Sequence, residues 1–164
     1  MLRRVWKNED GSALVEGAVI LPVLFALVFG VYEFSWFFYQ QHLISTGLRD
    51  GARYLARSTT SCDAASPLWA VQAANAKNLA TTASIAGGAP RVKGWSATMV
   101  VPRCIEIDNA SGAGVTSAYR GGTVISVISL STRFAEPSLG FFRLLGLQPP
   151  AISVMHSERM IGPG

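Results

Sequence analysis

The chain opens with one long apolar run, and beyond it the sequence mixes polar and apolar positions as a folded domain does. From Gly17 to Tyr39 there is no Lys, Arg or Asp. A helix of about 23 residues extends about 34 Å, enough to cross a hydrocarbon core of about 30 Å. The pattern therefore predicts a membrane-spanning segment at residues 17–39.

Aromatic residues gather at the C-terminal end of this run, where amphipathic rings favour the membrane interface. They are Tyr32, Trp36, Phe37, Phe38 and Tyr39. A cleaved secretory signal would have a shorter apolar region and then a small-x-small cleavage site. Bulky rings after Phe29 favour a retained anchor instead. Basic residues lie on both sides of the run, and the positive-inside rule favours a cytoplasmic N-terminus.

Small or compact residues recur every four positions in the apolar run. They are Ala18, Pro22, Ala26 and Gly30. Such a row lets another backbone approach closely and predicts a face for helix packing in lipid. The alternative is that Ala and Gly are simply common in membrane helices.

Two acids flank or interrupt the apolar run. A carboxylate at membrane depth costs several kcal/mol unless it is paired, protonated or near the interface. Glu16 and Glu33 are therefore candidate subunit contacts. For Glu33 the alternative is a position close enough to the outer interface to reach water.

The helical pattern continues past the membrane segment and predicts one helix over residues 12–58. Pro22 is its only proline, and Gly47 and Gly51 only weaken it. Its second half is amphipathic. Arg49, Arg53 and Arg57 recur every four residues and form a basic face, which suits lipid phosphates or an acidic partner, or is simply solvated.

Residues 59–164 predict a small domain, which makes the whole chain α+β. A second helix is expected from Pro67 to about Thr82, with Ser66 as its cap and proline at its first position. Three segments mix β-branched residues with Ser and Thr and predict an antiparallel sheet. They are residues 93–107, 122–134 and 151–160, with a Gly/Ser-rich connection at 109–122.

Residues 136–150 form an unusually apolar insertion between the last two strands. Its apolar residues are Leu139, Phe141, Phe142, Leu144, Leu145 and Leu147. Such a loop either contacts a membrane or a partner, or folds under the core, which is the commoner outcome.

Cys62 and Cys104 are the only cysteines. In an oxidising periplasm an even pair beyond the anchor predicts a disulfide, and closing that loop would contribute about 4 kcal/mol. Two buried thiols are the alternative.

Charge and motif content favour a structural protein over an enzyme. The net charge is +4, but the basic residues form no dense run with interleaved aromatics, so nucleic acid is not an expected partner. No metal-binding, phosphate-loop or nucleophile-elbow motif occurs. We expect no catalytic residues, no metal, no cofactor and no small-molecule substrate.

The sequence before the apolar run, DGSALVE, sets a glycine and a glutamate five residues apart, between a short basic leader and the helix. This arrangement resembles the site cut by prepilin peptidases. The resemblance implies removal of the leader, residues 1–11, after Gly11, with Ser12 as the new N-terminus and Glu16 as the fifth mature residue. Pilin-type sites usually carry Phe or Tyr after the glutamate, and this chain has Gly17.

The stretch from Gly11 to Phe34, followed by LRDGARYLA at residues 48–56, resembles the TadE-like family of pseudopilins, or minor pilin-like components, of the bacterial tight-adherence (Tad) pilus machinery. The resemblance covers roughly residues 3–57. It implies a subunit that assembles, primes or caps a pilus for surface attachment, with a cytoplasmic N-terminus and a periplasmic domain. Implied partners are the inner membrane, other pilins or pseudopilins, the assembly platform and a prepilin peptidase. The alternative function is a single-pass anchored periplasmic binding or sensory module outside any fibre.

Overall fold

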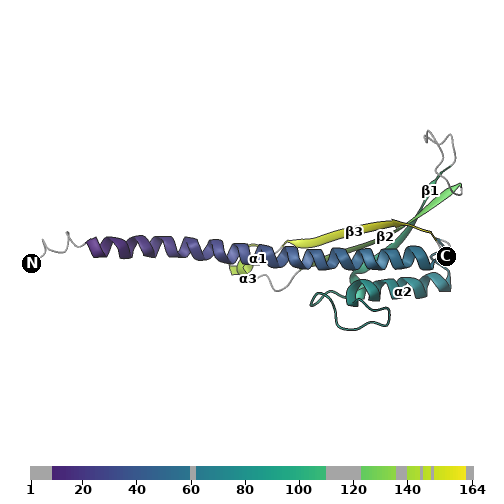
Figure 1. Ribbon diagram of the computed structural model, residues 1–164, viewed down its shortest axis with the longest axis horizontal. Coiled ribbons are helices and arrows are strands. Elements are labelled where there is room, and N and C mark those ends of the chain that lie inside the picture. Colours follow the sequence, from purple (N-terminus) through teal and green to yellow (C-terminus); the bar gives the residue numbers. More distant parts are fainter. Residues whose placement is uncertain are drawn as a thin grey trace, which may run out of the picture.

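One very long helix runs through the molecule, and a small domain packs along its C-terminal part (Figure 1). The structure is a computed structural model that describes residues 9–59, 62–109, 123–135, 140–144, 146–148 and 150–161. Its elements in chain order are α1 (Glu9–Ser58), α2 (Pro67–Thr82), the 3-10 turn η2 (Ala97–Met99), β1 (Val100–Asp108), β2 (Val124–Ala135), α3 (Gly140–Leu144) and β3 (Ala151–Arg159). The predicted α+β class, with a long N-terminal helix, a second helix and an antiparallel sheet, is confirmed.

Helix α1 has 50 residues and continues through Pro22 without a break. At 1.5 Å per residue it extends about 75 Å, roughly two and a half times the length that a membrane crossing needs. Its two parts differ in burial. Every residue from 11 to 32, the apolar half, is exposed or partly exposed, whereas residues 33–58, the domain half, carry a buried stripe.

Helix α2 runs antiparallel beside the domain half of α1 (Figure 1). It begins at the predicted residue, with Ser66 in an extended conformation before Pro67, but the Ser66 side chain makes no capping hydrogen bond. It ends at Ala83, which adopts a left-handed conformation with φ 62° and donates its N–H to Leu79 O. This bond satisfies one carbonyl of the last turn.

The sheet has the order β1-β2-β3, with both pairs antiparallel. The register places Leu130 opposite Pro102 on one side and His156 on the other. Alternate residues of β2 point to α1, and Ile128, Leu130 and Phe134 are buried there. This alternation follows from the period of two in a strand.

The first strand begins later than the sequence pattern predicted, at Val100 and not at Lys93. Gly94 has φ 87°, and Trp95 N–H bonds back to Val92 O, so residues 92–95 form a turn. Within residues 93–99, which were predicted to be part of the strand, the large apolar residue Trp95 is a core residue and not part of the sheet. Its ring is 1% exposed in the core, and its Nε1–H donates to Thr132 Oγ1 at 3.1 Å.

The core lies between the domain half of α1, α2 and the inner face of the sheet. From α1 it takes Ile44, Leu48, Ala52, Leu55 and Ala56, and from α2 it takes Trp69, Ala73, Ala76 and Ala80. Small residues on both helices let the two backbones approach closely. The sheet then closes the other side of α1.

The described part of the apolar insertion lies outside this core, whereas the commoner expectation was that the insertion folds under it. Its described part, α3 and residues 146–148, lies against α1 on the N-terminal side of α2 and the sheet (Figure 1). Leu144 is 80% exposed and Leu147 is 53% exposed. Instead, Phe142 contacts Glu33 and Phe34, which are not among the core residues of α1. Leu139 and Leu145 fall outside the described residues.

Candidate functional site

The apolar half of α1 is the largest exposed apolar surface among the described residues. Its side chains from Leu14 to Tyr32 are at least half exposed at nearly every large hydrophobic position. A helix with apolar side chains exposed on all sides is unfavourable in water and favourable in lipid. Among the described residues, the helix Gly11–Ser58 is long and apolar enough to cross a membrane.

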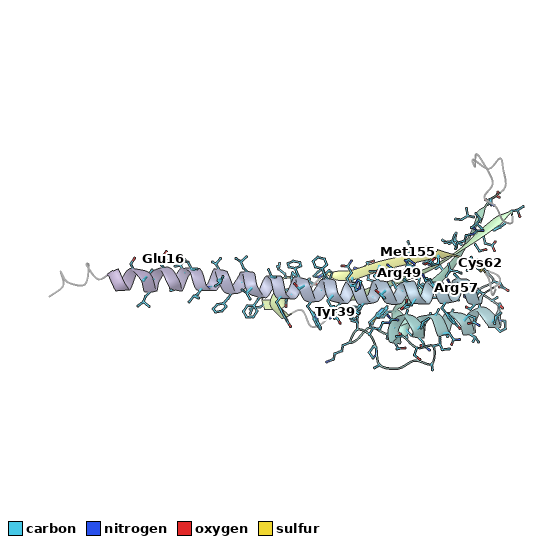
Figure 2. The ribbon with its side chains drawn as sticks, in the orientation of Figure 1. Glu16, Tyr39, Arg49, Arg57, Cys62 and Met155 are labelled. Atoms are coloured by element: carbon cyan, nitrogen blue, oxygen red, sulfur yellow. A yellow bond between two sulfur atoms is a disulfide. The ribbon has the colours of Figure 1, made fainter. Side chains whose placement is uncertain are left out.

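The predicted processing residues lie at the exposed beginning of α1. Gly11, Ser12 and Glu16 are all exposed, and a Cβ built on Gly11 would meet nothing within 4 Å. Figure 2 shows Glu16 near the N-terminal end of α1, far from α2 and the sheet. Residues 1–8 of the leader fall outside the described residues.

The predicted packing row, Ala18, Pro22, Ala26 and Gly30, lies within the apolar half. Gly30 is partly exposed, and the other three are exposed. A Cβ built on Gly30 would meet nothing within 4 Å. The row is therefore accessible to another helix.

The sequence reasoning missed a second pair of small residues, Gly47 and Gly51, which it treated only as weak points of the helix. Both are buried against α2. A Cβ on Gly51 would lie 2.7 Å from Ala76 O and 2.8 Å from Leu130 Cδ2, and one on Gly47 would collide with Ala80 O. The signal was present in the sequence, because two glycines four residues apart on an amphipathic helix favour close backbone packing.

Glu33 is placed differently from Glu16, although both were candidate subunit contacts. The Glu33 side chain is 8% exposed, and its Oε2 accepts a hydrogen bond from the Phe142 backbone N–H at 3.1 Å. Next to it, the rings of Phe34 and Phe142 meet edge to face with centroids 5.5 Å apart. Its own chain therefore surrounds the carboxylate at the first turn of α3.

The basic face is exposed as expected, but its three residues differ in their surroundings. Arg53 Nε donates to Glu158 Oε1 at 3.1 Å, and the same oxygen lies 2.9 Å from His156 Nε2. Hydrogen bonds from His156 and Arg53 lower the pKa of Glu158. Arg57 lines a shallow hollow with Tyr54 and Ser58. Within the described part of the chain, no ion pair joins Arg49 or Arg57 to an acid.

A disulfide joins Cys62, just after α1, to Cys104 in β1, with the two Cα atoms 5.4 Å apart. This is the pair that the sequence predicted. Figure 2 shows Cys62 at the end of the molecule opposite to Glu16. The bond fixes the end of the domain half to an outer strand of the sheet.

The N-terminal part of the chain is similar to a known protein family. Residues 11–53 match the family model described as TadE-like protein, which is about a quarter of the chain. The matched residues begin at Gly11 and end at Arg53, so they cover the whole apolar half of α1 and most of its domain half. No curated protein and no solved structure matches the chain. The similarity to TadE-like proteins thus lies in the long N-terminal helix of this chain.

Proposed function

We propose that this chain is a membrane-anchored structural subunit that helps to assemble, prime or cap a Tad pilus, with a cytoplasmic N-terminus and a periplasmic domain. One observation carries the proposal. The TadE-like match begins at Gly11 and spans the part of α1 that the chain's own domain leaves exposed. A helix of this kind has two environments open to it, lipid and the matching helices of other subunits.

In the proposed assembly, the apolar half leaves lipid and packs beside helices of neighbouring subunits. The row Ala18, Pro22, Ala26 and Gly30 presents little side-chain bulk there, so two backbones can approach closely and gain van der Waals contact. Glu16 then pairs with the N-terminal amine of a neighbour and sets the axial register. A desolvated ion pair suits that purpose, because a shifted register leaves both charges unpaired.

That amine has to be created first, by a prepilin peptidase that cuts after Gly11. The intact mass of the protein purified from membranes tests this step. We expect the mass of a chain that begins at Ser12. A full-length chain, from a strain in which the same peptidase processes another pilin, would contradict the cleavage.

Substitution of the two acids tests the role of Glu16. We expect Glu16→Gln to reduce surface pili at least about tenfold, because removing one partner of a buried pair leaves the other uncompensated at several kcal/mol. Membrane insertion should be unchanged, since it depends on the apolar run. Pili and attached cells are counted in strains with equal membrane levels of each variant.

Glu33→Gln is the matched control, because a glutamine oxygen can still accept the Phe142 N–H. We expect near-normal piliation in that variant. Normal piliation with Glu16→Gln would contradict the ion pair and favour an anchored periplasmic binding or sensory module. Equal defects in both variants would contradict the assignment of the contact to Glu16.

A further inference from the structure

The α3 segment, residues 140–144 and 146–148, is held against α1 at the boundary between its apolar half and its domain half. The Phe142 N–H bonds to Glu33 Oε2, and the Phe142 ring meets the Phe34 ring. A third bond, from Leu147 N–H to Phe142 O at 2.8 Å, folds the segment back on itself. Figure 1 shows α3 beside α1, displaced from the rest of the domain toward the N-terminus.

Among the described side chains of this segment, Leu144, Leu147 and Gln148 are exposed, and two of these three are large and apolar. Leu144 is 80% exposed and Leu147 53%, while Phe34 of α1, in contact with Phe142, is 49% exposed. Together with Phe142 they form an apolar cluster that continues directly from the surface of the apolar half. An exposed apolar cluster contiguous with a lipid-facing helix indicates that lipid also covers the cluster.

The position of α3 along α1 limits how deeply α3 can lie in the bilayer. Glu33 precedes Tyr39 by six residues, or about 9 Å along the helix. A hydrocarbon span that ended at Tyr39 would therefore immerse α3. Hydrocarbon does not accept lipid-exposed irregular backbone, because its N–H and C=O groups find no water there. A five-residue helix followed by a turn fits the membrane interface instead.

We propose that the α3 segment is an interfacial anchor, with Phe142, Leu144 and Leu147 in the boundary between headgroups and acyl chains on the domain's side of the bilayer. The proposal rests on the proposed function, since it requires α1 to be in a membrane. It moves the hydrocarbon span of about 20 residues toward the N-terminus, to roughly residues 13–32. Glu33 then lies at the interface with a hydrogen-bond partner from its own chain.

The same shift changes the surroundings of Glu16. With the span beginning near Ala13, Glu16 lies about 5 Å inside the hydrocarbon, one helical turn from its inner edge. A carboxylate there is unfavourable without a partner. If α3 lies at the outer interface, Glu16 is therefore buried more deeply on the inner side, and an ion pair with its carboxylate becomes more important.

Depth-dependent fluorescence quenching of the full chain in vesicles tests this placement. A nitrobenzoxadiazole label is attached at Leu144→Cys, with the native disulfide intact, in vesicles of phosphatidylcholine and phosphatidylglycerol. Some of the lipids carry a nitroxide, either near the headgroup or near the end of the acyl chain. Labels at Leu24→Cys in the apolar half and Val71→Cys on α2 are the references, and both positions are at least half exposed.

We expect the Leu144 label to be quenched at least about twofold more by the shallow nitroxide than by the deep one, because interfacial segments enter only about 5–10 Å. Leu24 should show the reverse order, and Val71 little quenching by either. Quenching at Leu24 but none at Leu144 would overturn the interfacial anchor and leave the proposed function intact. Stronger deep quenching at Leu144 would also overturn it. A Leu24 label that neither nitroxide quenches would overturn the membrane anchor itself, and the inference with it.

Discussion

The two halves of α1 show how one sequence pattern serves two kinds of packing. Both carry small residues four positions apart: Ala26 and Gly30 in the apolar half, Gly47 and Gly51 in the domain half. A Cβ on Gly30 would meet nothing within 4 Å, whereas one on Gly51 would strike Ala76 O and Leu130. The spacing predicts close approach by another backbone, but not whether that backbone belongs to the same chain.

What distinguishes the halves is the rest of the helical surface. In the domain half, exposed Arg49, Arg53 and Arg57 lie opposite buried residues, so only the apolar face of the helix has to be covered by other residues. In the apolar half, large hydrophobic residues surround the helix on every side. A helix with a polar face is completed by its own domain, and a helix without one requires lipid or other chains.

The largest expected effect comes from removing the covalent bond that closes the domain half. The double variant Cys62→Ser/Cys104→Ser should lose about 4 kcal/mol of unfolding free energy, because the bond constrains a loop with a sequence separation of 42 residues. Chemical unfolding of the full chain in detergent, followed by near-ultraviolet circular dichroism, measures the loss. The helicity and membrane insertion of the apolar half should be unchanged.

A reducing agent provides the internal control for this variant. It should lower the stability of the native chain to that of the variant and leave the variant unaffected. Native protein that titrates with two free thiols would contradict the bond, and with it the constraint on the domain half.

Matched glycine substitutions compare the two halves directly. Gly47→Ala places a methyl group against the backbone carbonyl of Ala80 and 3.1 Å from Trp95 Cη2. Backbone cannot yield as a flexible side chain does, so we expect a loss of about 3 kcal/mol of unfolding free energy. Gly30→Ala should leave domain stability unchanged, since its Cβ meets open space.

The same pair can also separate packing within the chain from packing between chains. If Gly30 belongs to an intersubunit face, Gly30→Ala should reduce piliation without a change in domain stability. Equal thermal stability of both variants would show that α2 does not approach α1 as closely as described.

The smallest expected effect concerns the ion pair on the polar face of the domain half. Glu158→Gln removes the negative charge shared by Arg53 and His156, and for a largely exposed pair we expect a loss of about 0.5 kcal/mol. The pKa of Glu158 is lowered in the folded protein. The stabilisation is therefore present above the ordinary glutamate pKa and lost as the pH falls through the lower, folded-state value.

Unfolding measured at neutral pH and at about pH 3 detects this difference. The difference in unfolding free energy between wild type and Glu158→Gln should be smaller at the acidic pH than at neutral pH. Glu106→Gln, at an exposed position of β1, is the control and should show no such pattern. A gap of constant size at both pH values would mean that the charge of Glu158 does not contribute.

Local signals in the sequence were sufficient for α1, α2 and the presence of three strands, but not for the start of β1 or for α3. Contacts between distant residues determined the rest. The apolar run and the Ser66–Pro67 start are local, and α1 and α2 were predicted from them. The contact of Glu33 with Phe142 joins residues 109 positions apart, and that of Arg53 with Glu158 joins residues 105 apart. No spacing rule reaches so far along the chain, so the surroundings of Glu33 and the partner of Arg53 emerged only from the fold.

The domain packs lengthwise on α1, and this arrangement also determines how the molecule resists a tensile force. Helix α2 and strand β3 lie along α1 rather than across its end (Figure 1). A tensile force on the N-terminal end of α1 therefore loads these contacts together, in shear, instead of peeling them apart one by one. Beyond the helix, the Cys62–Cys104 bond closes the chain between α1 and β1 into a loop, so force cannot extend that part of the chain. Tension along α1 is thus shared across the whole domain before any single element has to yield.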